Sequence, residues 1–82
     1  MDQDIQKACR IGNISVIKSV VASNPSKINE IDQKLGWTPL YRTVICSHAE
    51  ATTFLLDSGA DPNIKNRMGE SPLHQAADNK EY

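Results

Sequence analysis

Apolar residues recur at helical spacing in several short segments of this chain. In residues 48–57, Ala51, Phe54 and Leu55 stand at positions i, i+3 and i+4, which predicts a helix with one buried stripe. A second helix is predicted over residues 4–10, where acidic side chains at the start suit the positive end of the helix dipole. The inward positions of this second helix are Ile5, Ala8 and Cys9. Each helix has a single apolar side and needs a neighbour to be stable.

A short motif occurs twice, 33 residues apart. Gly-Trp-Thr-Pro-Leu-Tyr at residues 36–41 returns as Gly-Glu-Ser-Pro-Leu-His at residues 69–74. In each copy the glycine suits a tight turn with positive φ, and the proline suits the first position of a helix. The hydroxyl of Thr38 or Ser71 stands where it can cap that helix. The second copy therefore predicts a helix over about residues 71–78.

A longer segment recurs less closely. Residues 11–21 resemble residues 46–56, and each segment leads into a small polar stretch that favours a turn. Gly59 stands where it can end the helix of residues 48–57 in the left-handed conformation. The exit loop of the first unit, residues 24–29, is slightly longer than its counterpart. Turn, helix, link and second helix thus repeat, which predicts stacked helix hairpins.

Length and charge narrow the classes of function. Eighty-two residues allow one small domain, and one Trp, two Tyr and one Phe are few large side chains with which to fill a core. Residues 1–41 carry five basic and four acidic side chains, and residues 42–82 carry four and six. Neither half has the basic excess that a nucleic-acid partner requires. The longest apolar run is three residues, which excludes membrane insertion.

Cysteine usage bears on the location of the protein. Cys9 and Cys46 stand 37 positions apart, which is neither a disulfide framework nor a metal or redox spacing. The acidic N-terminus also lacks the basic and apolar regions of a signal peptide. These features favour an intracellular protein, cytoplasmic or nuclear. Cys9 itself falls on an apolar helix face and is predicted to lie in the core.

Three of these motifs together are similar to the ankyrin repeat. They are Gly-x-Thr-Pro-Leu at residues 36–40, Ser-His-x-Glu at 47–50 and Leu-Leu-x-x-Gly-Ala-Asp-x-Asn at 55–63. The resemblance covers nearly the whole chain. It implies an all-α solenoid of stacked helix-turn-helix units with projecting turns, about 2.5 repeats long, with an incomplete C-terminal repeat. The expected divisions of this single domain, 1–82, are an N-terminal capping repeat at 1–31, a full repeat at 32–64 and the first half of a third at 65–82.

Departures from the family pattern carry expectations of their own. Tyr41 stands where the family usually has His, and Thr43 and Val44 stand where it has two alanines. The bulkier pair should push the neighbouring helices slightly apart, or need smaller residues opposite. By the 33-residue offset the chain ends as a second helix should begin. We therefore expect a fragment of a longer array, which continues into or docks on further ankyrin repeats.

The residues that could support catalysis or metal binding are few. Cys46 and His48 hint at a nucleophile pair, but positions i and i+2 do not face each other on a helix. His48 is better explained as a structural hydrogen-bonding residue. His48 and His74 have no Cys or carboxylate at zinc-ligand spacing, and no Gly-rich stretch with Lys-Ser/Thr could cradle a phosphate. We therefore expect no enzyme activity, no metal and no cofactor.

The resemblance implies a protein partner, bound along the turn tips and the faces of the first helices. Carried over position by position, the candidate partner-binding residues are Lys34, Leu35, Trp37, Ile45, Cys46, Arg67, Met68, Glu70, Asp78 and Asn79. Leu35, Trp37 and Met68 are apolar where a turn is normally polar, as at an interaction site. The alternative for Trp37 is that it folds back on the next turn, over Met68 or Arg67.

Two questions stay open at this level. Asn63 resembles an ankyrin asparagine that accepts β-hydroxylation, or its amide simply braces the turn between repeats. The leading function is a protein–protein interaction module. The alternatives are the targeting segment of a larger enzyme or regulatory protein with domains beyond residue 82, and a structural or inhibitory segment that works only on its parent array.

Overall fold

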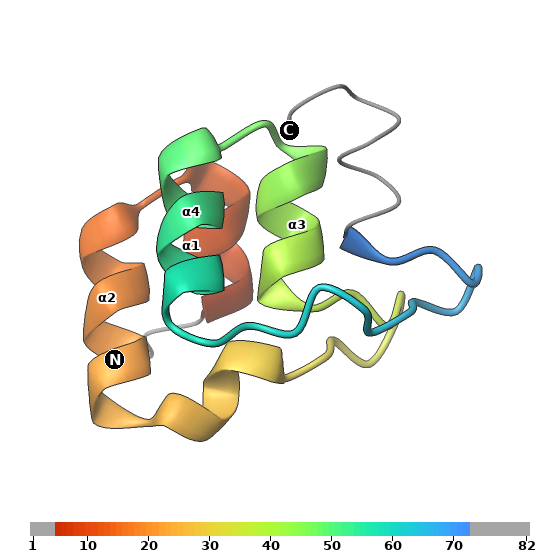
Figure 1. The fold of residues 1–82 in the computed structure, drawn as a ribbon, viewed down its shortest axis with the longest axis horizontal. Coiled ribbons are helices and arrows are strands. Elements are labelled where there is room, and N and C mark those ends of the chain that lie inside the picture. Colours follow the sequence, from red (N-terminus) through yellow and green to blue (C-terminus); the bar gives the residue numbers. More distant parts are fainter. Residues whose placement is uncertain (1–4, 73–82) are drawn as a thin grey trace.

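The computed structural model describes residues 5–72, which form two helix hairpins side by side (Figure 1). The elements in chain order are α1 (Ile5–Ile11), α2 (Ile14–Ser23), the 3₁₀ helix η1 (Pro25–Asn29), α3 (Pro39–Ile45) and α4 (Ala49–Asp57). The predicted all-α repeat architecture is confirmed. The helix predicted over 4–10 is α1, and the one predicted over 48–57 is α4. The longer exit loop of the first unit contains η1.

Two layers of helices make up the body of the molecule. The first helices of the hairpins, α1 and α3, lie side by side, and the second helices, α2 and α4, pack behind them. The turns that follow η1 and α4 both project on the same side of the body, beyond α3 (Figure 1). This arrangement brings residues about 33 positions apart in sequence next to each other.

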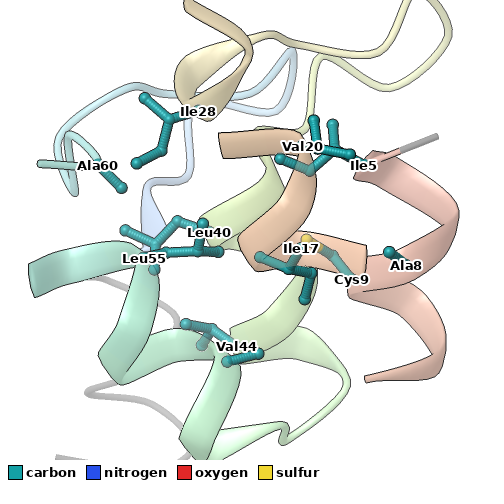
Figure 2. Packing of buried hydrophobic residues seen from close by; sticks show 11 residues of the cluster. Ile5, Ala8, Cys9, Ile17, Val20, Ile28, Leu40, Val44, Leu55 and Ala60 are labelled. Atoms are coloured by element: carbon teal, nitrogen blue, oxygen red, sulfur yellow. The ribbon is translucent and has the colours of Figure 1, made fainter. Parts of the chain in front are cut away.

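The core fills the space between the two hairpins (Figure 2). Its side chains are aliphatic apart from one thiol: Ile5, Ala8, Cys9, Ile17, Val20, Ile28, Leu40, Val44, Ala51, Leu55 and Ala60. The predicted inward positions of α1 are all buried, and so are Ala51 and Leu55 of α4. Phe54 is only partly buried and packs against the edge of this cluster, because Thr52 occupies a buried position on the same helix. Small side chains from both hairpins therefore replace a large aromatic centre.

The turn and cap signals of the sequence have the predicted geometry. Gly36 and Gly69 have φ values of 73° and 80°, and the Thr38 hydroxyl accepts the Tyr41 N–H at 3.1 Å with Pro39 next to it in the first turn of α3. Gly59, at φ 99°, ends α4 as predicted. The predicted third helix, residues 71–78, lies almost wholly outside the described residues.

The ends of α3 and α4 have the same hydrogen bonds on different residues. After α4, the Gly59 N–H donates to the Leu56 carbonyl at 3.1 Å, and the Ala60 N–H donates to the Leu55 carbonyl at 2.9 Å. After α3, Ser47 makes the equivalent bond to Val44 at 3.1 Å, and His48 bonds Thr43 at 2.9 Å. Both ends are Schellman motifs. Ser47 adopts φ 60°, where glycine is ordinarily favoured.

The buried Thr43 side chain is hydrogen-bonded to its own helix and to α4. It is fully buried, and so, almost completely, is the side chain of Thr52 on α4. The Thr43 hydroxyl donates to the Leu40 carbonyl at 2.9 Å and accepts from the Thr52 hydroxyl at 2.9 Å. Because both hydroxyls are paired, this polar contact between α3 and α4 carries little burial penalty.

Candidate functional site

The first projecting turn, residues 32–37, is organised by one carboxylate. Asp32 Oδ1 accepts the backbone N–H groups of Lys34 at 2.9 Å and Leu35 at 2.6 Å, and Oδ2 accepts that of Trp37 at 3.3 Å. The N–H of Asp32 in turn donates to the Trp37 carbonyl at 3.0 Å, and that of Gly36 donates to the Asp32 carbonyl at 3.2 Å. The turn is therefore closed at its base and braced from within.

The second projecting turn, residues 66–70, uses a neutral amide for the same task. Asn66 Oδ1 accepts the N–H groups of Met68 at 2.8 Å and Glu70 at 3.0 Å, and the Asn66 N–H donates to the Glu70 carbonyl at 2.8 Å. Asn66 stands three residues before Gly69, whereas Asp32 stands four before Gly36. The second turn is thus one residue shorter and has fewer N–H groups around its acceptor.

The two turns contact each other directly. The Arg67 N–H donates to the Leu35 carbonyl at 3.3 Å, and the Arg67 guanidinium donates to the Gln33 carbonyl. Gly36 lies close to Arg67 at this contact, since a Cβ added at Gly36 would stand 3.2 Å from Arg67 Cγ. We call the four outward side chains of the paired turns, Lys34, Leu35, Arg67 and Met68, the tip surface. All four are exposed, Leu35 to 46% and Met68 to 80%.

Trp37 packs within its own repeat. Its ring lies 5.0 Å from that of Tyr41, at an interplanar angle of 57°, and the Arg42 guanidinium carbon stands 4.7 Å from its centroid. These ring contacts support packing of Trp37 on Tyr41 and Arg42, and not the alternative in which it stacks over Met68 or Arg67. The indole is half-buried, so one part of it stabilises the turn and another stays accessible beside the tip surface.

Arg42 joins the first turn to both first helices. Its Nε donates to Gln6 Oε1 of α1 at 2.9 Å, and its Nη2 lies 3.3 Å from Asp32 Oδ2. Gln6 Nε2 then donates to the carbonyls of Glu30 at 3.1 Å and Trp37 at 3.0 Å. This cluster ties α1, α3 and the turn together at the edge of the tip surface.

The pKa of Asp32 reflects this surrounding. Burial of the carboxyl raises the pKa, but the backbone N–H groups of Leu35, Lys34 and Trp37 and the charge of Arg42 together outweigh it. The pKa is therefore lower than the ordinary value of 3.8. A carboxylate that accepts several N–H bonds is stabilised in its charged form.

Glu70, a predicted partner-binding residue, is engaged inside the structure. Its carboxylate accepts the Tyr41 hydroxyl at 2.9 Å, which links α3 to the second turn. Burial raises the pKa of Tyr41, and the hydrogen bond and negative charge of Glu70 raise it further. Tyr41, in place of the family's usual His, thus supports the following turn as Gln6 supports the first.

The other predicted binding residues are distributed unevenly. Ile45 and Cys46 are half-buried at the C-terminal end of α3, at i+3 and i+4 from Arg42 and therefore on the same side of the helix. They lie at the opposite end of α3 from the turns. Asp78 and Asn79 lie outside the described residues. The tip surface is consequently the place where several predicted residues meet.

The two remaining candidate residues, His48 and Asn63, take part in hydrogen bonds within the fold. His48 Nε2 lies 2.9 Å from the Arg10 carbonyl oxygen, and a Cβ on Gly12 would stand 2.8 Å from the imidazole. His48 therefore caps the C-terminus of α1 from the next repeat, which confirms its hydrogen-bonding role. Asn63 is exposed, and its N–H donates to Asp61 Oδ1 at 2.9 Å. Its hydroxylation stays a prediction.

Within residues 5–72, no three His, Cys, Asp or Glu side chains are grouped so that they could hold a metal ion. In that same part of the chain, no helix has both the length and the apolar character to cross a membrane.

Sequence reasoning did not find Asp32, Arg42 or Gln6. Asp32 had a local signal, because an acidic or amide side chain shortly before a turn glycine often accepts the N–H groups of the turn. Arg42 and Gln6 had none. They stand 36 positions apart in the sequence, and only the stacking of α1 on α3 brings them within 2.9 Å.

Three curated proteins illustrate what the chain is similar to. It is 34% identical over 73 residues to BTB/POZ domain-containing protein 3 of Schizosaccharomyces pombe, covering 89% of this chain and 14% of that protein. It is 28% identical over 74 residues to the putative ankyrin repeat protein YahD of Escherichia coli, covering 84% and 36%. It is 40% identical over 77 residues to the human oxysterol-binding protein-related protein 1, covering 93% and 8%. The chain thus spans about a third or less of the length of each.

A family profile described as ankyrin repeats, in three copies, matches residues 5–82. The profile agrees with the observed order of turn, first helix, link and second helix, and with the glycine, threonine and proline at the start of α3. Repeats of this kind are generally protein-interaction modules and typically not catalytic. Since the match covers nearly the whole length, the chain belongs to the ankyrin-repeat family.

Proposed function

We propose that this chain is a non-catalytic protein–protein interaction module, which binds a protein partner through its turn tips and the exposed side of its first helices. The observation that carries the proposal is the tip surface. There, Leu35 is 46% exposed and Met68 is 80% exposed on two turns that are hydrogen-bonded to each other. Exposed apolar side chains that are close together favour association, because their contact with a partner removes them from water.

The rigidity of the turns also supports the proposal. Asp32 and Asn66 hold the two backbones from within, and Arg42 restrains both Asp32 and Trp37. A surface that is already ordered loses less conformational entropy when a partner binds. The accessible part of Trp37 would extend the apolar contact beyond Leu35 and Met68, and tryptophan is among the residues that contribute most to interfaces.

A pull-down from the native cell extract with the full chain tests this proposal. We expect Leu35→Ser combined with Met68→Ser to reduce recovery of the partner about tenfold, since two exposed apolar contacts are lost. Ile31→Ser is the matched control, because Ile31 is 45% exposed, nearly as much as Leu35, and belongs neither to the tip surface nor to a first helix. Circular dichroism of each variant checks the fold. Equal recovery by the wild type and the double variant would contradict the proposal.

The alternative is that the module acts as a targeting segment of a larger enzyme or regulatory protein inside the cell. The observation in its favour is the small share of each relative that the chain covers, from 8% to 36% among the three described. The transcript of the corresponding gene, read in full, tests it. An open reading frame that codes for no additional domain would exclude this alternative.

A further inference from the structure

The balanced charge of the two sequence halves conceals a separation of charge in three dimensions. Among the exposed charged side chains of the two turns and the residue before the second, every one is basic: Lys34, Lys65 and Arg67. The acidic side chains of these turns are engaged internally. Asp32 accepts hydrogen bonds from three backbone N–H groups and pairs with Arg42, and Glu70 accepts a hydrogen bond from the Tyr41 hydroxyl. The outward charge of the turns is therefore positive.

The first helices extend this positive side. Lys7 and Arg10 are exposed on the side of α1 opposite its buried residues, whereas the exposed charges of α4 are Glu50 and Asp57. Four charges lie off this division. Glu30 and Lys27 pair with each other at 3.5 Å, and Lys18 on α2 lies 5.8 Å from the centre of the Phe54 ring. Asp61, in the loop between α4 and the second turn, is exposed and accepts the Asn63 N–H. The layer of first helices and turns is thus mainly basic, and α4 is acidic.

The tip surface combines this charge with apolar groups. Lys34 and Leu35 are consecutive on one turn, Arg67 and Met68 are consecutive on the other, and a backbone hydrogen bond joins the two turns. We propose that the tip surface binds an acidic protein segment that carries apolar side chains. This inference rests on the proposed function and names the chemical class of the partner.

The combination fits a polypeptide better than a nucleic acid. A phosphate backbone would meet the basic groups but would leave Leu35 and Met68 in contact with water. The aromatic ring nearest the tips, Trp37, is half-buried and covered by Arg42, so it offers no free platform on which a base could stack. An acidic peptide with leucine-like side chains satisfies both kinds of group at once.

Selection of random short peptides on the immobilised full chain tests the inference. We expect the enriched peptides to combine Asp or Glu with large apolar residues. One enriched peptide, labelled with fluorescein, is then titrated by fluorescence anisotropy against the wild type and against Lys34→Glu combined with Lys65→Glu. We expect the charge reversal to weaken binding about tenfold at low salt, and added salt to weaken binding to the wild type.

Matched variants make each result decisive. Lys18→Glu reverses one lysine on α2, to be compared with Lys34→Glu alone, and should alter the peptide affinity less than about twofold, since exposed charges far from a binding site are screened. Enrichment of basic or uncharged peptides, or equal binding by the wild type and the charge-reversed variant, overturns the inference. If Leu35→Ser and Met68→Ser abolish peptide binding while charge reversal does not, the proposed function survives without it. If neither change matters, both proposals fail.

A single-stranded RNA oligonucleotide that displaces the peptide at equal concentration would assign the surface to nucleic acid instead.

Discussion

The two projecting turns share a backbone design and differ in the side chain that holds it. Asp32 braces the first turn with a charged carboxylate that accepts three N–H groups and Arg42. Asn66 braces the second with a neutral carbonyl oxygen that accepts two N–H groups. The first turn is one residue longer, which gives room for the additional donor.

This difference shows how a repeat can couple its turn to neighbouring helices. A carboxylate attracts a cation, and Arg42 in turn bonds Gln6, so the first turn is tied electrostatically to α1 and α3. The amide of Asn66 attracts no counter-ion, and the second turn is tied to α3 by the neutral Tyr41 hydroxyl on Glu70. The carboxylate of Asp32 titrates and the amide of Asn66 does not, so the brace of the first turn depends on pH and that of the second does not.

The largest expected effect is the loss of the carboxylate. Asp32→Ala should lower the free energy of unfolding by about 2–4 kcal/mol, because three N–H groups and the half-buried Arg42 lose their acceptor. Asn66→Ala should cost about 1–2 kcal/mol, since it removes a neutral acceptor with two donors. Urea unfolding followed by circular dichroism measures both. Equal costs would remove the distinction between the turns.

The pH dependence separates charge from shape. The pKa of Asp32 in the folded chain is below the ordinary 3.8, so the carboxylate contributes stability above pH 3.8 that is lost as the pH falls through the folded value. We expect Asp32→Asn to be less stable than the wild type at neutral pH. The two urea midpoints should converge as the pH falls below 3.8. A constant gap down to pH 2 would show that Asp32 acts only through its shape.

Replacing the turn glycine should also cost more in the first turn than in the second, but the difference should be smaller than that between Asp32→Ala and Asn66→Ala. Both have positive φ, so Gly69→Ala should cost about 1 kcal/mol from backbone conformation alone. Gly36→Ala should cost about 2 kcal/mol, because its Cβ would also crowd Arg67, at 3.2 Å from Cγ and 3.3 Å from the backbone N. Thermal unfolding compares the pair. A larger cost at Gly69 would contradict the contact between the turns.

The smallest effect is expected at the second turn. Tyr41→Phe removes the hydrogen bond to Glu70 and should lower the free energy of unfolding by about 0.5–1.5 kcal/mol, since Glu70 can turn toward water. The fluorescence of Trp37, the only tryptophan, should change as well because its ring stands 5.0 Å from that of Tyr41. Glu70→Gln, which keeps an acceptor for the hydroxyl, should be less destabilised than Tyr41→Phe.

Local patterns predicted most of the fold. The glycines at 36, 59 and 69, the Thr38 cap and the inward positions Ile5, Ala8 and Leu55 all followed from neighbours within four residues. Phe54 was predicted inward as fully as Leu55, because helical spacing alone does not say which side of the stripe α2 and α3 cover. Trp37 was left with two alternatives because its neighbours Tyr41 and Arg42 are near in sequence but are held by residues of other segments: Arg42 by Gln6 and Asp32, and Tyr41 by Glu70.

The sequence alone determined the repeat, its turns and its helix caps, because these depend on φ preferences and on hydrogen bonds over a few residues. Only the tertiary structure decided which charges face outward. Asp32 and Glu70 count as acidic in the composition, yet both are turned to partners within the fold, and Lys34 and Arg67 are left to face solvent. Asp32 is engaged by groups within ten positions of it, but its cation Arg42 is also held by Gln6 of the preceding hairpin, 36 positions away, and Glu70 is engaged by Tyr41, 29 positions away. Contacts over such separations are made only when one repeat stacks on the next.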